Sequence, residues 1–597
     1  MPLYPQFQSQ YTRRLVTDSF GGLERALRVP EGQWYATFNV CHDDLPALST
    51  RPRRGLTERR AWALGEKKAL ACVGTDGTLY FNFLPTGLTG LSAGEKQLVS
   101  LGAYLCVFPD KKYINTENLS EYGSMEASYL GSASYQPCRA DGTPFEAASS
   151  AVAPAAPANG DYWVDTSSER AVLRQWSEAQ REWIGIESAC VKISFSSQGS
   201  VPALFAAGDG VTISGSSLAD VNGDKLIRAL GGGAGQSDWI MVTGLAPTLP
   251  AGTESLTLKR QIPALDFVCE CQNRLWGCRY GLGEDGAAIN EICCSALGDF
   301  KNWRRFEGLS SDSWAASVGS DGPWTGAVNY LGYPTFFKEN RIHRVTVSAE
   351  GAHRVDETVC RGVQRGCSKT LAVVNETLYY KSPADVCAYQ GGFPASVSRA
   401  LGELSCASAA GGAIGGKYYL SVTDQEGQSF LYVYDIARES WLREDDLRAL
   451  DFAAVDGELY ALAADGGTGG RLVALRGSLP TELSARESAP SWYLIGGLQR
   501  FEQPDNLRLS RFNLRLRLAA GASAAVYVRY DASLSDDPEA DWTLVGAIAA
   551  GERDSVDHYV LPVRPRRCDH LQLAIAGSGE ATLCSIATLL EPGSDYR

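Results

Sequence analysis

The stretch TLAVVNETLYYKS, Thr370–Ser382, contains the pattern that decides the fold. A short apolar run is followed by a polar turn at Asn375–Glu376 and then by a second run with two tyrosines. This order predicts a β-hairpin. Comparable stretches include GAIGGKYYLSVTD at 412–424 and FAAVDGELYALAADGG at 452–467, whereas helical periodicity is hard to find. The sequence therefore predicts an all-β protein.

The hairpins repeat at a regular spacing. Each contains an apolar or aromatic pair: Phe336–Phe337, Leu378–Tyr379, Tyr418–Tyr419 and Leu459–Tyr460, with the second members 42, 40 and 41 residues apart. A period near 40 in short strands is typical of β-propeller blades, which bury their faces by stacking. The pairs Leu275–Trp276 and Leu79–Tyr80 extend the series. We expect about five to seven blades.

The rest of the chain departs from this repeat and suggests additional domains. Residues 139–160 are rich in Ala, Pro, Ser and Gly, which is typical of a linker. Beyond residue 486, leucines alternate with arginines, as in Leu514–Arg515–Leu516–Arg517, which predicts a β-sandwich with one solvated face. The predicted parts are an N-terminal arm (1–40), first blades (41–138), linker (139–160), inserted small β-domain (161–262), remaining blades (263–485) and C-terminal sandwich (486–597).

Composition narrows the class of function. The 597-residue chain has a net charge of -14, which disfavours general nucleic-acid or membrane-surface binding, although a local basic ring could still exist. The N-terminus has no apolar core of a signal peptide, and no run of about 18 apolar residues predicts a membrane span. Sixteen cysteines in such a chain are more typical of buried thiols than of disulfides.

The stretch VCECQNRLWGCRYG, Val268–Gly281, concentrates cysteines and raises the question of a metal or redox site. Cys269 and Cys271 are two positions apart and share one face of a strand, whereas adjacent Cys293 and Cys294 point to opposite faces. This spacing favours structural thiols in a blade hairpin, with a metal or a disulfide as alternatives. We expect no cofactor, no metal and no catalytic constellation, and hence no enzyme.

Two groups of residues are candidate contacts. A basic cluster near the N-terminus could face DNA or an acidic partner, or could be a solvated loop: Arg51, Arg53, Arg54, Arg59 and Arg60. In the predicted insertion, Trp163, Trp176 and Trp183 could form a sugar-binding platform, or could be the core of a small β-domain.

A distinctive pattern is formed by Gly32, Asn39, Pro46, Leu48, Arg51, Arg54 and Gly55, the segments Asn273–Trp303 and Val191–Gly215, and the C-terminal PVRPRRCDHLQLAIAGSGEATLCSI. In this pattern the chain resembles virion proteins of tailed phages of the kind found in Firmicutes prophages. The resemblance implies a propeller-bearing structural protein similar to the tail nozzle and DNA-stabilising ring proteins of short-tailed phages. The family implies no catalytic residues.

The resemblance, together with the all-β layout, predicts a structural component of a phage tail or head–tail connector. We expect a homo-oligomeric ring near the DNA channel, with portal, adaptor or other tail proteins and packaged DNA as partners. Its location would be the virion, after assembly in the bacterial cytoplasm. The alternative is a tail-tip adhesin, or a propeller that binds or cleaves carbohydrate, suggested by the aromatic-rich insertion and the sandwich.

Overall fold

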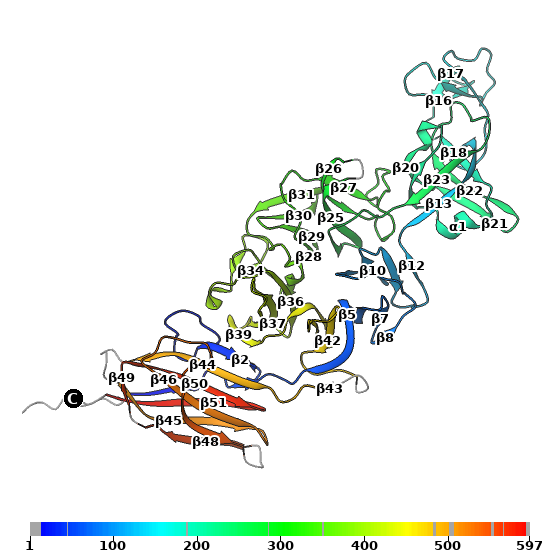
Figure 1. The fold of residues 1–597 in the computed structure, drawn as a ribbon. Helices are drawn as coiled ribbons and strands as arrows, with labels where there is room; N and C mark the ends of the chain where they lie inside the picture. Colours follow the sequence, from blue (N-terminus) through cyan, green and yellow to red (C-terminus); the bar gives the residue numbers. More distant parts are fainter. Residues whose placement is uncertain are drawn as a thin grey trace, which may run out of the picture. The chain divides into compact units, whose positions relative to one another are not determined.

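Strands make up most of the protein in the computed structural model (Figure 1). The structure describes residues 13–44, 46–186, 189–283, 286–348, 352–480, 485–500, 507–550, 555–564 and 566–592. Within these ranges, the single α-helix is α1, Ser200–Leu204. The prediction of an all-β fold is confirmed.

Five separate four-stranded sheets have the strand order of propeller blades, because in each the strands pair in chain order. The apolar–aromatic pairs from 275–276 onward all lie on the second strand of a hairpin, which is why their spacing was regular. The sheets are β9–β12 (Gln97–Leu101, Tyr104–Phe108, Lys112–Asn115, Tyr122–Ser124), β24–β27 (Phe267–Cys271, Arg274–Leu282, Ala288–Cys294, Trp314–Ser317), β28–β31 (Gly326–Tyr330, Tyr333–Lys338, Arg341–Val347, His353–Val359), β32–β35 (Ala372–Val374, Thr377–Lys381, Val386–Tyr389, Ala395–Ser396) and β36–β39 (Ser408–Ile414, Lys417–Thr423, Ser429–Asp435, Ser440–Asp445).

A larger sheet joins early and late blade strands through one long strand, β5 (Gly55–Lys67). The first half of β5 pairs with β42 (Gly470–Ala474), and its second half pairs with β6 (Ala69–Gly74). The remaining strands of this sheet are β40 (Ala449–Val455), β41 (Glu458–Ala463), β7 (Leu79–Phe81), β8 (Leu84–Pro85) and β43 (Ala485–Arg486). Leu79–Tyr80 therefore lies on the strand after β6, one strand later than the repeat predicted.

The cysteine-rich stretch forms the hairpin of β24 and β25 and packs in apolar cores. Cys269, Cys271, Cys278 and Cys294 pack with Trp276, while Cys293 belongs to a different cluster on the other face. All sixteen cysteines are free thiols. The prediction that these thiols fill a core is confirmed.

The chain divides into two compact units: residues 1–95, 337–342 and 358–597, and residues 96–336 and 343–357. The second unit contains a seven-stranded sheet in the order β20, β19, β23, β13, β18, β22, β21. The bounds are β13 Ala127–Cys138, β18 Cys190–Phe195, β19 Gly210–Ser214, β20 Gly223–Leu226, β21 Ala229–Gly233, β22 Gln236–Thr243 and β23 Glu254–Arg260. Its core includes Val191, Ile193 and Leu258, all essentially unexposed.

The strands of this sheet show that the inserted domain begins earlier than the sequence predicted. The insertion begins with β13 at Ala127, because β13 pairs with both β18 and β23, and not at residue 161 as the sequence predicted. The predicted linker 139–160 is not wholly irregular either. It contains β14, Ala147–Ser150, which runs parallel to β15, Tyr162–Asp165.

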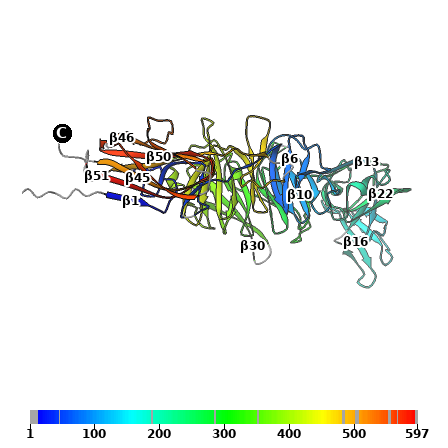
Figure 2. The same cartoon turned by 90° about the horizontal axis from the view of Figure 1, so that it is seen from below.

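The C-terminal sandwich lies in the first unit and is built from two sheets (Figure 2). Its inward-facing side chains, such as Leu514, Leu516 and Val526, are fully buried, whereas Arg515 and Arg517 are exposed, as the alternation predicted. One sheet contains β45 (Leu507–Leu518), β48 (Ser555–Pro562), β49 (Arg567–Cys568) and β51 (Ala581–Pro592). The other contains β44 (Ser491–Arg500), β46 (Ser523–Tyr530), β47 (Thr543–Ala549) and β50 (His570–Ser578).

Early residues complete both sheets of the sandwich. The strand β1 (Arg13–Thr17) pairs with β51, and β2 (Trp34–Phe38) pairs with β44. Two short strands, β3 (Val40–Cys41) and β4 (Leu48–Thr50), extend the β51 sheet. The predicted N-terminal arm is therefore structural from residue 13 onward, while residues 1–12 lie outside the described residues.

Candidate functional site

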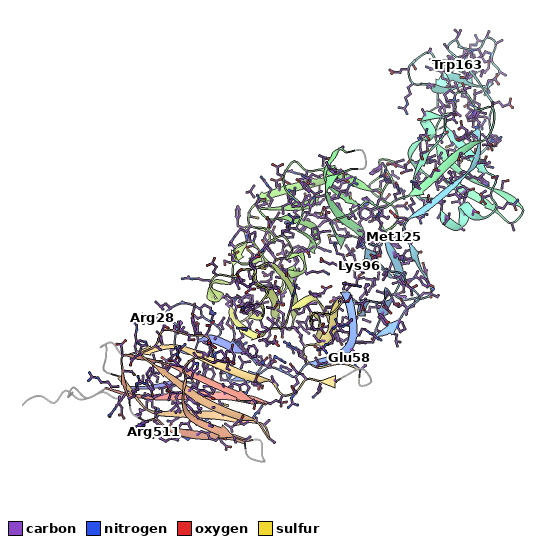
Figure 3. The ribbon with its side chains drawn as sticks, viewed as in Figure 1. Arg28, Glu58, Lys96, Met125, Trp163 and Arg511 are labelled. Atoms are coloured by element: carbon purple, nitrogen blue, oxygen red, sulfur yellow. The ribbon has the colours of Figure 1, made fainter. Side chains whose placement is uncertain are left out.

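A small four-stranded sheet in the second unit gathers the three predicted tryptophans on one face. Its strands are β14, β15 (Tyr162–Asp165), β16 (Val172–Ser177) and β17 (Glu182–Gly185). Trp163 is paired with Arg174, and Trp176 with Trp183. Because side chains alternate along a strand, these residues lie on the same side of the sheet. We call the set Trp163, Asp165, Arg174, Trp176 and Trp183 the tryptophan face. Trp163 is labelled in Figure 3.

The three rings form one cluster but differ in exposure. The Trp183 ring centroid lies 5.5 Å from that of Trp163 and 5.5 Å from that of Trp176, both edge to face. Trp163 is only 6% exposed, and its Nε1 donates to the Ser150 carbonyl at 3.0 Å. Trp176 and Trp183 are half-buried. Trp163 therefore anchors the cluster, while the other two rings remain accessible.

Charged groups border the rings. Arg174 Nε donates to Asp165 Oδ2 at 2.9 Å, and the Arg174 guanidinium lies 5.8 Å from the centre of the Trp163 ring. Hydrogen bonds from Ser167, and to a smaller extent the hydrogen bond from Arg174, hold the pKa of Asp165 below its usual value. The carboxylate is therefore ionised at neutral pH. Trp176 Nε1 donates to Glu178 Oε2 at 3.1 Å. The face thus presents two aromatic planes beside fixed donors and acceptors.

The opposite face of this sheet carries its own apolar side chains. Val164 and Leu173 are 2% and 3% exposed, and they are directly paired across β15 and β16. Tyr162 packs against Phe145 with centroids 4.6 Å apart. Trp163 packs as a core residue, in agreement with the interpretation as the core of a small β-domain, whereas Trp176 and Trp183 are half-buried. Their contact with a glycan remains a prediction.

In the first unit, two arginines of the predicted basic cluster are buried and do not face a partner. Arg51 and Arg54 are 3% and 4% exposed. Arg51 binds Glu487 with two hydrogen bonds of 2.7 and 2.9 Å, and Arg54 Nη1 lies 2.6 Å from Asp445 Oδ2. These two guanidinium groups are therefore internal structural groups and are not free to contact DNA or an acidic partner.

The other three arginines of the cluster also have partners within the chain. Arg53 Nε lies 3.1 Å from Glu580, and Arg60 Nη2 binds both Asp465 oxygens at 2.5 and 2.6 Å. Arg59 donates to the Phe83 carbonyl and lies over the Tyr80 ring. The five arginines therefore do not form one free basic patch. The acidic partners of Arg51, Arg53, Arg54 and Arg60 are hundreds of residues away in the sequence, with no local signal to reveal them.

Across the described ranges, no group of three or more His, Cys, Asp or Glu is arranged to hold a metal ion. In the acidic loop 220–224, Asp220 accepts a hydrogen bond from the Leu245 amide, and Asp224 pairs with Arg304.

No helix among the described residues is long and apolar enough to cross a membrane.

No family model matches the sequence, and no curated protein matches it. Solved structures do match. Trypanosoma rangeli sialidase in complex with the inhibitor DANA is 10% identical over 83% of this chain and 91% of that chain, with a TM-score of 0.21. Another structure of that sialidase matches 96% of both chains with a TM-score of 0.20. A GH43 protein from Bacillus licheniformis is 9% identical over 54% of this chain and 96% of its own, with a TM-score of 0.17.

These matches contradict the prediction that the protein is not an enzyme, because the matched proteins bear the names of a sialidase and a GH43 protein. At TM-scores this low, the likeness carries no argument for a particular reaction or residue. None of the three is named as a phage protein, so the phage resemblance remains a prediction.

Proposed function

We propose that the protein binds carbohydrate and that the tryptophan face is its sugar-contacting surface. The observation that carries this proposal is the cross-strand pair Trp176–Trp183, half-buried on a face that also carries the ion pair of Arg174 and Asp165. A sugar ring has apolar C–H groups on its faces and hydroxyl groups on its edge. An aromatic plane beside fixed polar groups satisfies both.

The rigidity of the face supports the proposal. Trp163 is held by its Nε1 hydrogen bond, and Trp183 packs against both of the other indoles. The carboxylate of Asp165 also accepts the Ser167 amide at 3.0 Å, which fixes the direction of its oxygens. Groups that are ordered before binding lose less conformational entropy on binding, so a weak stacking surface gains affinity from this arrangement.

The full-length chain is tested on a glycan array, and the strongest ligand is then titrated by calorimetry. Replacing both Trp176 and Trp183 by alanine is expected to weaken binding at least tenfold, which corresponds to about 1.4 kcal/mol. Trp542→Ala serves as the matched control, because Trp542 is a half-buried tryptophan of the sandwich. Equal affinities of the wild type and the double variant would contradict the proposal, as would the absence of any glycan binding.

A further inference from the structure

The first unit contains a cavity of about 660 Å³ whose wall is rich in arginine. The wall is formed by the segment from β3 to β5, by the chain beyond β42, and by β43, β45 and β51. Its charged side chains are Arg51, Arg53, Arg476, Arg486 and Arg517, together with Asp43, Asp44 and Glu580. Arginines thus exceed carboxylates by two in the wall.

Most of these charges are already paired. Asp43 binds Lys417, Arg53 lies 3.1 Å from Glu580, and Arg517 lies 4.0 Å from Asp44. Arg51 is held by Glu487, as described above, and its Nη2 also lies 3.3 Å from Asp445 Oδ2. These pairs fix the wall but contribute little net charge.

Two arginines of the cavity wall differ from the others in their charge pairing. Arg476 and Arg486 are exposed, and neither forms an ion pair with any residue that the structure describes. Asp43 and Glu458 act on Arg476 only at longer range, and Tyr419 is its side-chain hydrogen-bond partner. The two guanidinium groups therefore present two positive charges to the cavity. The wall also includes hydroxyl groups from Ser49, Thr50 and Thr582.

We propose that this cavity binds a phosphate group, with Arg476 and Arg486 as its principal ligands. A phosphate monoester carries between about 1.5 and 2 negative charges at pH 7, which matches the two unpaired guanidinium groups. The planar fork of arginine suits paired hydrogen bonds to phosphate oxygens. The volume lies in the range of small-molecule sites and leaves room for the group that bears the phosphate. This proposal does not depend on sugar binding at the tryptophan face.

The test uses the full-length chain in chloride buffer at pH 7.5. Inorganic phosphate and phenyl phosphate are titrated by calorimetry, with acetate as the carboxylate probe. We expect both phosphates to bind, phenyl phosphate at least as tightly as inorganic phosphate, and acetate to bind at least tenfold more weakly. The double substitution Arg476→Gln with Arg486→Gln should weaken phosphate binding at least tenfold, because hydrogen bonds between charged groups are the strong class.

Arg399→Gln is the matched control, since Arg399 is an exposed arginine of the same unit outside the cavity wall. Circular dichroism and the midpoint of thermal unfolding establish that each variant is folded. If the double variant does not fold, Arg486→Gln alone replaces it, with the same expected direction. The proposal is overturned if phosphate does not bind, if the variant binds it as tightly as the wild type, or if acetate binds equally well.

Discussion

At the scale of single residues, burial separates side chains that look alike in the sequence. Arg51 and Arg60 occur in the same basic run, yet Arg51 is 3% exposed while the Arg60 side chain is 31% exposed. The sequence identified the arginines but not their partners Glu487 and Asp465, which lie more than 400 residues away. Such pairing depends on the assembled fold, so local pattern could not predict it.

Replacing Arg51 by alanine is expected to destabilise the isolated protein by about 3–5 kcal/mol, because it leaves Glu487 without its buried counter-charge. The measurement is the free energy of unfolding in urea. Arg354→Ala is the control, because the Arg354 side chain is 76% exposed and should change stability by less than about 1 kcal/mol. Similar small effects from both substitutions would show that Arg51 is not the internal group described above.

At the scale of elements, the blade hairpins could be predicted because each is local in sequence. The pairs Leu378–Tyr379 and Tyr418–Tyr419 both lie on the second strand of a four-stranded sheet. The start of the insertion was missed because β13 contains mostly small and polar residues apart from Tyr129, Leu130 and Tyr135, so it resembles a loop. The accessible pair Trp176–Trp183 was identified, but its neighbours Asp165 and Arg174 were not.

One carboxylate holds the start of α1, the only α-helix among the described residues. Asp238 accepts hydrogen bonds from the Gly199 and Val201 amides and from the Ser197 hydroxyl, at 2.5, 3.1 and 2.7 Å. Burial disfavours its ionised form, yet these bonds hold the pKa of Asp238 below its usual value of 3.8. We expect Asp238→Ala to destabilise the second unit by about 2–3 kcal/mol, measured by urea unfolding with Asp141→Ala as the exposed control.

The lowered pKa of Asp238 also predicts how its contribution to stability depends on pH. Because the native pKa of Asp238 is lower than its value in the unfolded chain, its contribution is fully present above that unfolded value of about 3.8. The contribution is lost as the pH falls through the native pKa. The stability difference between wild type and Asp238→Ala should therefore shrink below pH 4. A difference that stays constant from pH 7 to pH 3 would contradict this role.

At the scale of the whole molecule, the first unit is assembled from segments far apart in the chain. Strands β1 to β4 complete the sheets of a sandwich formed mainly by residues 491–592. Hydrophobic alternation predicted the C-terminal strands but could not reveal which early strands complete them, because that pairing is non-local. Fold class was thus accessible from the sequence, whereas the start of the insertion and the early strands of the sandwich were not. The virion location and its partner proteins remain predictions.

This arrangement predicts that residues 486–597 alone do not form a stable sandwich. Without β1 and β2, the edges of β51 and β44 are left unpaired, and the buried Trp34 is missing from the core. We expect the fragment to aggregate or to lack a cooperative thermal transition by circular dichroism, and co-expression of residues 13–50 to restore both solubility and the transition. A soluble, cooperatively folded fragment on its own would contradict the account.

The central claim is that Trp176 and Trp183 contact a sugar. Its most direct measurement is nuclear magnetic resonance of the full-length chain with ¹⁵N-labelled tryptophan, whose thirteen indole signals are assigned by single substitutions. The strongest glycan from the array is then added stepwise. The account predicts that the indole signals of Trp176 and Trp183 shift with the titration, whereas those of Trp276 and Trp441 in fully buried cores stay unchanged. A glycan that binds without moving the Trp176 and Trp183 signals would contradict it.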